Sequence, residues 1–84
     1  MTTQDNRFYF NVINGGTELD PDGTLLSGIA EARSQALRML GAMLQEADSN
    51  FPWGGTPWRV WVSDGPQGSG RVLFTLQVSA VEHG

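Results

Sequence analysis

SGIAEARSQALRMLGAMLQEAD, residues 27–48, is the stretch that decides the fold of this chain. Its apolar residues recur every three or four positions, which is the spacing of one face of an α-helix. Ser27 is suited to cap the helix N-terminus, and Glu31 places negative charge in the first turn, where the helix dipole favours it. The pattern predicts one long amphipathic helix that packs on a single face. The residues of that face are Ile29, Ala32, Ala36, Leu37, Met39, Leu40, Met43, Leu44 and Ala47.

Two residues interrupt the apolar face of this helix. Arg33 falls inside it, and we expect its stem to lie on apolar surface while its guanidinium pairs with Asp20 or Asp22 of the preceding turn. That ion pair would hold the turn to the helix. Gly41 costs about 1 kcal/mol relative to alanine in mid-helix. It is either a tolerated weak point or a place where another backbone approaches closely.

Composition limits the possible classes of protein. The chain has 84 residues, enough for one domain with one modest core. We expect residues 1–6 and 80–84 to be frayed. Cysteine is absent, which excludes disulfides and thiolate chemistry. Since no apolar run is long enough for a signal peptide or a membrane span, we expect a cytoplasmic protein.

The charge pattern argues against nucleic acid and membrane partners. The net charge is −4, and the five basic residues are all arginines scattered along the chain. A nucleic-acid-binding surface needs clustered basic residues that neutralise phosphates. An anionic membrane surface would need the same, so we expect neither partner.

Four segments outside the helix have the alternating pattern of strands. They are residues 7–14, 24–26, 58–63 and 71–79, separated by turns rich in glycine, proline, asparagine and aspartate. The predicted order is β-β-α-β-β, a small α+β protein in which one helix covers one face of an antiparallel sheet. The order of the strands within the sheet stays open.

The face of the sheet away from the helix is too apolar for a fully solvated surface. It is expected to carry Tyr9, Ile13, Trp61, Leu73 and Thr75, with Trp53 at its edge. We therefore predict an interface there, for a second copy of the chain or for another protein. The alternative is that these residues are scattered, or that the loop around Trp53 covers them.

The loop of residues 49–57 contains Phe51 and Trp53, which are unusually apolar for a solvated segment. Prolines and glycines exclude regular structure there. The two aromatic side chains either close the end of the core or contact a partner.

Catalytic chemistry has little support in the sequence. The only histidine is His83, next to the end of the chain, and neither a nucleophile elbow nor a phosphate-binding loop is present. We expect a protein that is not an enzyme and that holds no cofactor.

The acidic turn of residues 18–23 resembles a calcium loop in its alternating carboxylates. A loop that starts at Glu18 has Ile29 at the twelfth position, where glutamate is required. A loop that starts at Asp20 has Leu25 where glycine is required. A solvated turn with an aspartate cap is therefore favoured, and a small-ligand or metal site at Asp20 and Asp22 is a third possibility for function.

The order of these signals resembles a family of uncharacterised small α-proteobacterial proteins, domain of unknown function 6894. The resemblance lies in FYFNV at residues 8–12, D-x-x-G at 20–23, A-R-x-x-A at 32–36, W-x-V-x-V at 58–62 and the Asp64-Gly65 turn. It spans nearly the whole chain, although the FPWGGTP and GPQGSG loops are longer than the family pattern. Because that family has no assigned function, the resemblance implies a fold and no activity.

A second similarity is to antitoxin domains, in which an aromatic strand also leads into an alanine-rich helix. It is a similarity of topology only. It keeps open an alternative function, that of an adaptor that neutralises a partner enzyme.

Overall fold

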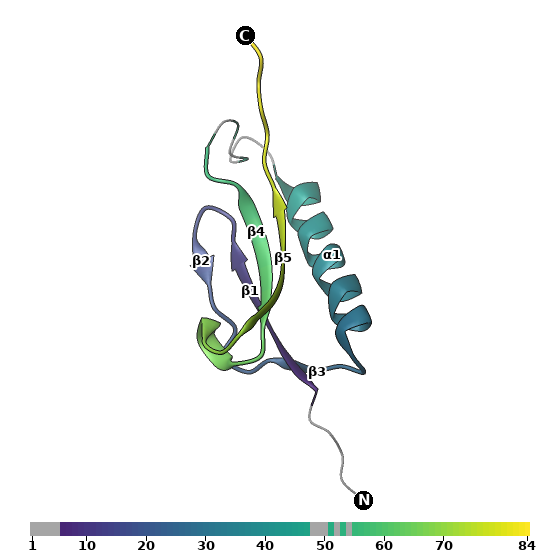
Figure 1. Ribbon diagram of the computed structural model, residues 1–84. Helices are drawn as coiled ribbons and strands as arrows, with labels where there is room; N and C mark the ends of the chain where they lie inside the picture. The colour runs from purple at the N-terminus through teal and green to yellow at the C-terminus, as the bar shows by residue number, and fades with distance from the viewer. Residues whose placement is uncertain (1–5, 48–50, 52, 54) are drawn as a thin grey trace, which may run out of the picture.

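The computed structural model describes residues 6–47, 51, 53 and 55–84 (Figure 1). One α-helix lies on one face of an antiparallel sheet, so the predicted α+β architecture is confirmed. The elements in chain order are β1 (Arg7–Ile13), β2 (Thr17–Glu18), β3 (Thr24–Leu25), α1 (Ile29–Glu46), β4 (Trp58–Ser63), the 3₁₀ turn η1 (Pro66–Gly68) and β5 (Val72–Val78).

The helix starts one residue later than the sequence predicts. Gly28 occupies the N-cap position, and the Ala32 N–H donates to the Gly28 carbonyl as the first helical bond. Both the backbone N–H and the hydroxyl of Ser27 donate to Glu31 Oε1, at 2.8 and 2.7 Å. Ser27 therefore fixes the entry to the helix through Glu31 rather than by accepting a backbone hydrogen bond. At the other end α1 stops at Glu46, and residue 48 lies outside the described residues.

The strand order is β2-β1-β4-β5, and β3 also pairs with β1. The central pair joins β1 to β4, with Phe10 opposite Val62 and Val12 opposite Val60. β4 and β5 form the predicted hairpin, with Trp58 opposite Val78. β5 is the last strand of the sheet on its side.

The first half of the chain contains a strand that the sequence did not predict. Residues 17–18 pair with Ile13 and Val12, while β3 pairs with the other end of the same strand, at Arg7 and Phe8. Since β2 is only two residues long, it has no alternation that a sequence pattern could reveal. The Asn6 carbonyl accepts the Leu26 N–H at 3.0 Å, so Asn6 is not part of a frayed terminus. Residues 1–5 lie outside the described part of the chain.

The core lies between α1 and the sheet. Val60, Val62, Ala32 and Ala36 are fully buried, because the two alanines let the helix backbone approach the central strands closely. The phenylalanines of β1 and several longer side chains complete the cluster: Phe8, Phe10, Val12, Leu26, Met39, Leu40, Met43, Leu73, Phe74 and Leu76.

Strict alternation places Leu73 on the open face of the sheet, but in the structure its side chain lies on the core face. The pairing shifts between Val62 and Ser63, so that Val62 faces Phe74 while Ser63 faces Val72. This β-bulge leaves Leu73 without a partner and re-aims its side chain. Leu73 packs against the core cluster, and the expectation that it lies on the open face is wrong.

The C-terminal segment leaves the sheet as an extended chain (Figure 1). Ala80 forms an isolated parallel bridge with Trp53, and residues 81–84 are exposed. No helix in the described parts of the chain is long and apolar enough to cross a membrane.

Close contact at Ala36 leads to a first prediction. Replacing Ala36 with leucine should lower the free energy of unfolding by about 1–3 kcal/mol, because the larger side chain overpacks the helix–sheet contact. Ala42→Leu, on the exposed side of the same helix, is the control and should change it by less than about 0.5 kcal/mol. Urea denaturation measures both values, and equal effects would contradict the packing described here.

Candidate functional site

The sheet face opposite α1 is the predicted interface, and the strand register defines its rows. Tyr9, Ser63 and Val72 form one row across the three strands, and Asn11, Trp61 and Thr75 form the next. The third row contains Ile13, Arg59 and Gln77.

The first two rows are partly covered by polar turns. Asn11 and Ser63 are both 0% exposed although they lie on the face away from the helix. Asn11 Nδ2 donates to the carbonyls of Tyr9 and Trp61 and to Ser63 Oγ, at 3.3, 3.2 and 3.1 Å. Asn11 Oδ1 accepts the backbone N–H of Asp20 at 3.0 Å. A buried amide needs such partners, and here they attach the acidic turn to the sheet.

Asp20 is the centre of that turn. Its Oδ2 accepts the backbone N–H of Phe10 at 3.0 Å, and its Oδ1 accepts those of Asp22 and Gly23 at 3.1 and 3.0 Å. Phe10 lies between the part of β1 that pairs with β3 and the part that pairs with β2. The Asp20 carboxylate thus takes the place of a backbone carbonyl along an edge where the neighbouring strand is interrupted.

The ionisation of Asp20 reflects these contacts. Partial burial raises the pKa of its carboxyl, but the backbone N–H groups of Gly23, Phe10 and Asp22 outweigh that effect and hold the pKa below its ordinary value. Hydrogen bonds to the charged form have this consequence because they stabilise the carboxylate.

Arg33 does not form the expected ion pair with the acidic turn. Its side chain is exposed on α1, and no salt bridge to Asp20 or Asp22 is present among the described residues. Both oxygens of Asp20 instead accept backbone N–H groups. The turn is fastened to β1 rather than to the helix.

Gly23 explains why this turn fits closely against the sheet. Its φ of 72° belongs to the left-handed region, where glycine is favoured. A Cβ at this position would lie 2.9 Å from Tyr9 Cε2 and 2.8 Å from Arg7 Cγ. The turn therefore covers Tyr9, which is only half-exposed.

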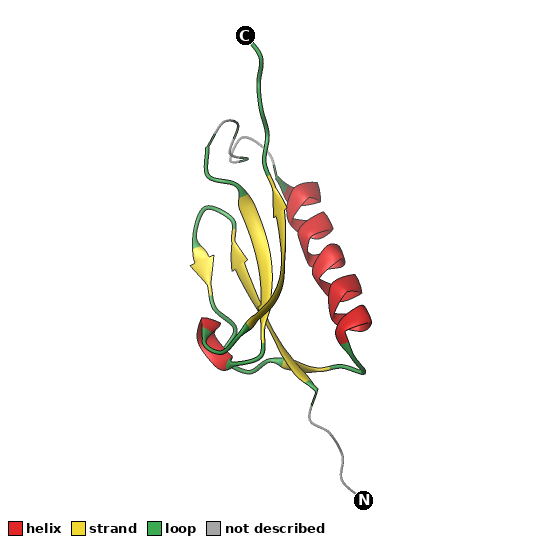
Figure 2. Ribbon diagram, in the orientation of Figure 1, coloured by secondary structure: helices red, strands yellow, loops and turns green. Residues whose placement is uncertain are grey.

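The loop between β4 and β5 closes over the same end of the sheet. The Gln67 N–H donates to the Asp20 carbonyl at 2.7 Å, and Ser63 Oγ donates to the Gly65 carbonyl at 3.1 Å. Asp64 Oδ1 accepts the Arg71 N–H at 2.6 Å and closes the hairpin. In Figure 2 this short helical turn lies on the opposite side of the sheet from the long helix.

Part of the predicted interface remains accessible in the third row and at Trp61 of the adjoining second row. Ile13, Arg59 and Trp61 are all half-buried, and Arg59 Nε is buried with no hydrogen-bond partner. Tyr9 lies under the acidic turn and Leu73 packs into the core. The five residues expected to form one interface therefore do not form a continuous apolar patch.

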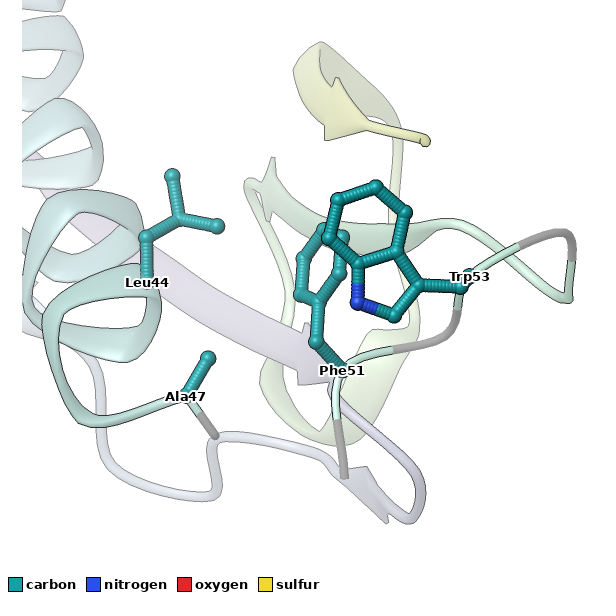
Figure 3. Close-up of a pocket in the computed structure, with 4 residues that line it drawn as sticks. All are labelled: Leu44, Ala47, Phe51 and Trp53. Carbon is teal, nitrogen blue, oxygen red and sulfur yellow. The ribbon is translucent and has the colours of Figure 1, made fainter. Parts of the chain in front are cut away.

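Trp53 lies beside the end of the helix rather than at the edge of the open face. With Leu44, Ala47 and Phe51 it lines an open hollow of about 390 Å³ (Figure 3). Phe51 packs edge-on against the buried Trp58, with ring centroids 5.2 Å apart, whereas Trp53 is 63% exposed. The two expected roles are divided: Phe51 closes the end of the core, and Trp53 is available for contact.

The free edge of β5 is a second candidate surface, which the alternation pattern of the sequence does not predict. β5 pairs with β4 and with no other strand of the described sheet. The signal in the sequence was the segment VLFTLQV at residues 72–78, which contains neither a charged residue nor a proline. Edge strands that stay solvated normally carry one or the other.

The acidic turn shows no arrangement suited to a metal ion. No group of three or more histidine, aspartate or glutamate side chains is placed to hold one in the described residues. Both oxygens of Asp20 are also occupied by backbone N–H groups.

Comparison with known protein families gives a match over most of the chain. The family described as domain of unknown function (DUF6894) matches residues 7–79, which is most of the chain, and the chain belongs to this family. The matched segment runs from the first residue of β1 to just beyond β5. No curated protein and no solved structure matches.

Asp20 supplies the second prediction. Asp20→Asn replaces one acceptor oxygen with an NH₂ group that faces backbone donors, so the free energy of unfolding at pH 7 should fall by about 1–3 kcal/mol. The folded-state pKa of Asp20 lies below the unfolded value, so its contribution is complete above the unfolded pKa and is lost as the pH falls through the folded pKa. The wild type and the variant should therefore converge in acid.

Urea titrations from pH 7 down to pH 2 measure this difference. Glu18→Gln is the control, because that carboxylate is exposed on β2. A constant difference between wild type and Asp20→Asn over the whole pH range would contradict the role given to the carboxylate.

Proposed function

We propose that this member of the domain of unknown function 6894 family is a small homodimeric protein that acts through protein contacts rather than catalysis, and that the two copies meet at the free edges of β5. A single observation carries the proposal: the two edges of the sheet differ. The edge at β1 is covered, whereas β5 pairs with no described strand on its outer side.

Two short strands and one side chain cover the β1 edge in succession. β2 pairs with one end of β1, β3 pairs with the other end, and the Asp20 carboxylate bonds the Phe10 N–H between them. Short strands and covering turns are the usual protection of an edge against further pairing. This side of the sheet has no long row of free backbone groups.

The hydrogen-bond pattern identifies the free groups on β5. The Phe10 N–H bonds Asp20, so Phe10 and Val62 are a pair without mutual hydrogen bonds, and the backbone groups of Val62 point to β5. Successive residues of a strand point their backbone groups to alternate sides. Phe74, opposite Val62, therefore bonds β4, and the N–H and C=O of Thr75 and Gln77 point away from the sheet.

A second copy of the chain fits this edge. Two β5 strands that run antiparallel about a two-fold axis would exchange these hydrogen bonds, and each copy would contribute the same seven residues. Such a self-complementary contact is the normal geometry of a homodimer. The two sheets would become one continuous sheet with both helices on the same face.

The other functions considered from the sequence have less support. An antitoxin-like adaptor would use a similar edge for a different protein, and no contact within the chain favours it. A small-ligand or metal site at the acidic turn competes with the backbone hydrogen bonds of Asp20. The open sheet face offers Ile13 and Trp61, but turns cover its other end.

A proline in β5 supplies the third prediction. Thr75→Pro removes an N–H that points outward and leaves the hydrogen bonds between β4 and β5 in place. We expect the variant to stay folded and to become monomeric in light scattering over a range of concentrations. Thr75→Ala, which keeps the N–H, should remain a dimer.

Trp61→Ser tests the alternative surface in the same experiment. Trp61 lies on the open face in the row of Thr75, so a dimer through that face should dissociate with Trp61→Ser and not with Thr75→Pro. That result, or a wild type that stays monomeric at every concentration, would overturn the β5 proposal. Circular dichroism confirms that each variant is folded.

A further inference from the structure

One flank of α1 is apolar and uncovered. Leu37 is 58% exposed and Leu44 is 38% exposed, and they lie seven residues apart, which is two turns of the helix. Gly41 lies between them, one turn from each. We call these three residues the leucine flank.

The leucine flank lies on the β5 side of the molecule. Leu44 lines the hollow that also contains Trp53 (Figure 3), and Trp53 bridges Ala80, just beyond the end of β5. The chain path agrees with this placement. β3 and β4 are parallel to each other because each is antiparallel to β1, and α1 connects them. Such connections are right-handed in about 98% of cases. In a right-handed connection, the leucine flank of α1 faces the β5 side of the sheet.

The described residues of one copy of the chain give no reason for glycine at position 41. Its φ is not positive, and a Cβ at this position would meet nothing within 4 Å. Neither the backbone geometry nor a described neighbouring residue requires glycine there. Between two exposed leucines it leaves a notch in the helix surface.

We infer that the leucine flank is the second half of the dimer contact and packs against the same flank of the second copy. This inference rests on the proposed β5 pairing. Stable interfaces bury about 800 Å² per partner, and one seven-residue strand edge presents little apolar surface. The adjoining helix flank supplies apolar area on the same side of the molecule.

The geometry of a paired sheet supports this contact. Strands are about 4.8 Å apart, and α1 packs on β4 and, to a lesser extent, on β5, so its axis lies about 5–7 Å from a two-fold axis beside β5. The two helices are then about 10–14 Å apart, and at the lower end of this range helices pack directly. The notch at Gly41 receives a leucine side chain of the partner.

The test compares two leucines that are equally exposed. Leu37 and Leu25 are each 58% exposed, but Leu25 lies on β3, at the covered edge of the sheet. Leu37→Ser should raise the dimer dissociation constant about tenfold or more, because each dimer loses two buried leucines. Leu25→Ser should leave it within about twofold of the wild type.

Gly41→Leu should stabilise the monomer and weaken the dimer, so its effects on the two states have opposite signs. Leucine favours the helix more than glycine does, so the thermal midpoint of the dissociated protein should rise. The same side chain fills the notch, so the dimer dissociation constant should also rise, about tenfold. If Gly41 mattered only within the monomer, Gly41→Leu would change the thermal midpoint and leave the dimer dissociation constant unchanged.

Sedimentation equilibrium of the full chain distinguishes the possible failures. If Thr75→Pro dissociates the dimer while Leu37→Ser and Gly41→Leu bind as the wild type does, the helix contact is overturned and the β5 pairing stands. If Leu37→Ser and Leu25→Ser weaken the dimer equally, the helix contact is likewise overturned. If none of these substitutions changes a stable dimer, both proposals fail.

Discussion

The structure depends on one carboxylate that replaces a missing strand. Asp20 gathers three backbone N–H groups, one from β1 and two from its own turn. Through its backbone it also holds the side chain of Asn11 and the N–H of Gln67. The interruption between β2 and β3 would leave the Phe10 N–H without a partner, and an unpaired buried donor is costly. The Asp20 carboxylate allows the chain to turn there without that cost.

This arrangement gives a physical meaning to the short motifs that carry the resemblance to the family. In the D-x-x-G segment, Asp20 supplies the carboxylate, and Gly23 supplies the left-handed backbone that fits closely against Tyr9. In the Asp64-Gly65 turn, Asp64 closes the hairpin through the Arg71 N–H. These residues resemble those of binding sites in type, yet their polar atoms are used within the fold. The surfaces proposed here for a partner are apolar and lie elsewhere, at the β5 edge and the leucine flank.

The parts of the fold that follow a period were predictable from the sequence. The 3.6-residue spacing of α1 and the alternation in β1, β4 and β5 gave the layers and most of the core, since period and burial are linked directly. The two-residue strand β2 is too short to show any period. The bulge at Leu73 interrupts the alternation of β5, so that Leu73, which alternation assigns to the open face, packs against the core.

The expected site was less predictable than the fold. Its residues were chosen by alternation alone, which says which face a side chain lies on but not what covers that face. Tyr9 is covered because a distant turn reaches it, and the Arg33 ion pair is absent because Asp20 has backbone partners that no spacing rule reveals. Trp53 was expected at the edge of the open face and lies beside the end of α1, since the path of a proline- and glycine-rich loop is not encoded by periodicity.

The buried contact between Asn11 and Ser63 also constrains how the molecule forms. The two residues are 52 positions apart in the chain, and the pairing of β1 with β4 spans the whole of α1. Contacts of this separation carry a large loop-closure entropy and slow the folding of a small domain. The β4–β5 hairpin and the helix are local and need no such closure, so we expect the docking of β1 to be the late step. Until it occurs, β4 would expose the edge that β1 will occupy, and a newly synthesised chain would have two unpaired strand edges in place of the single edge at β5.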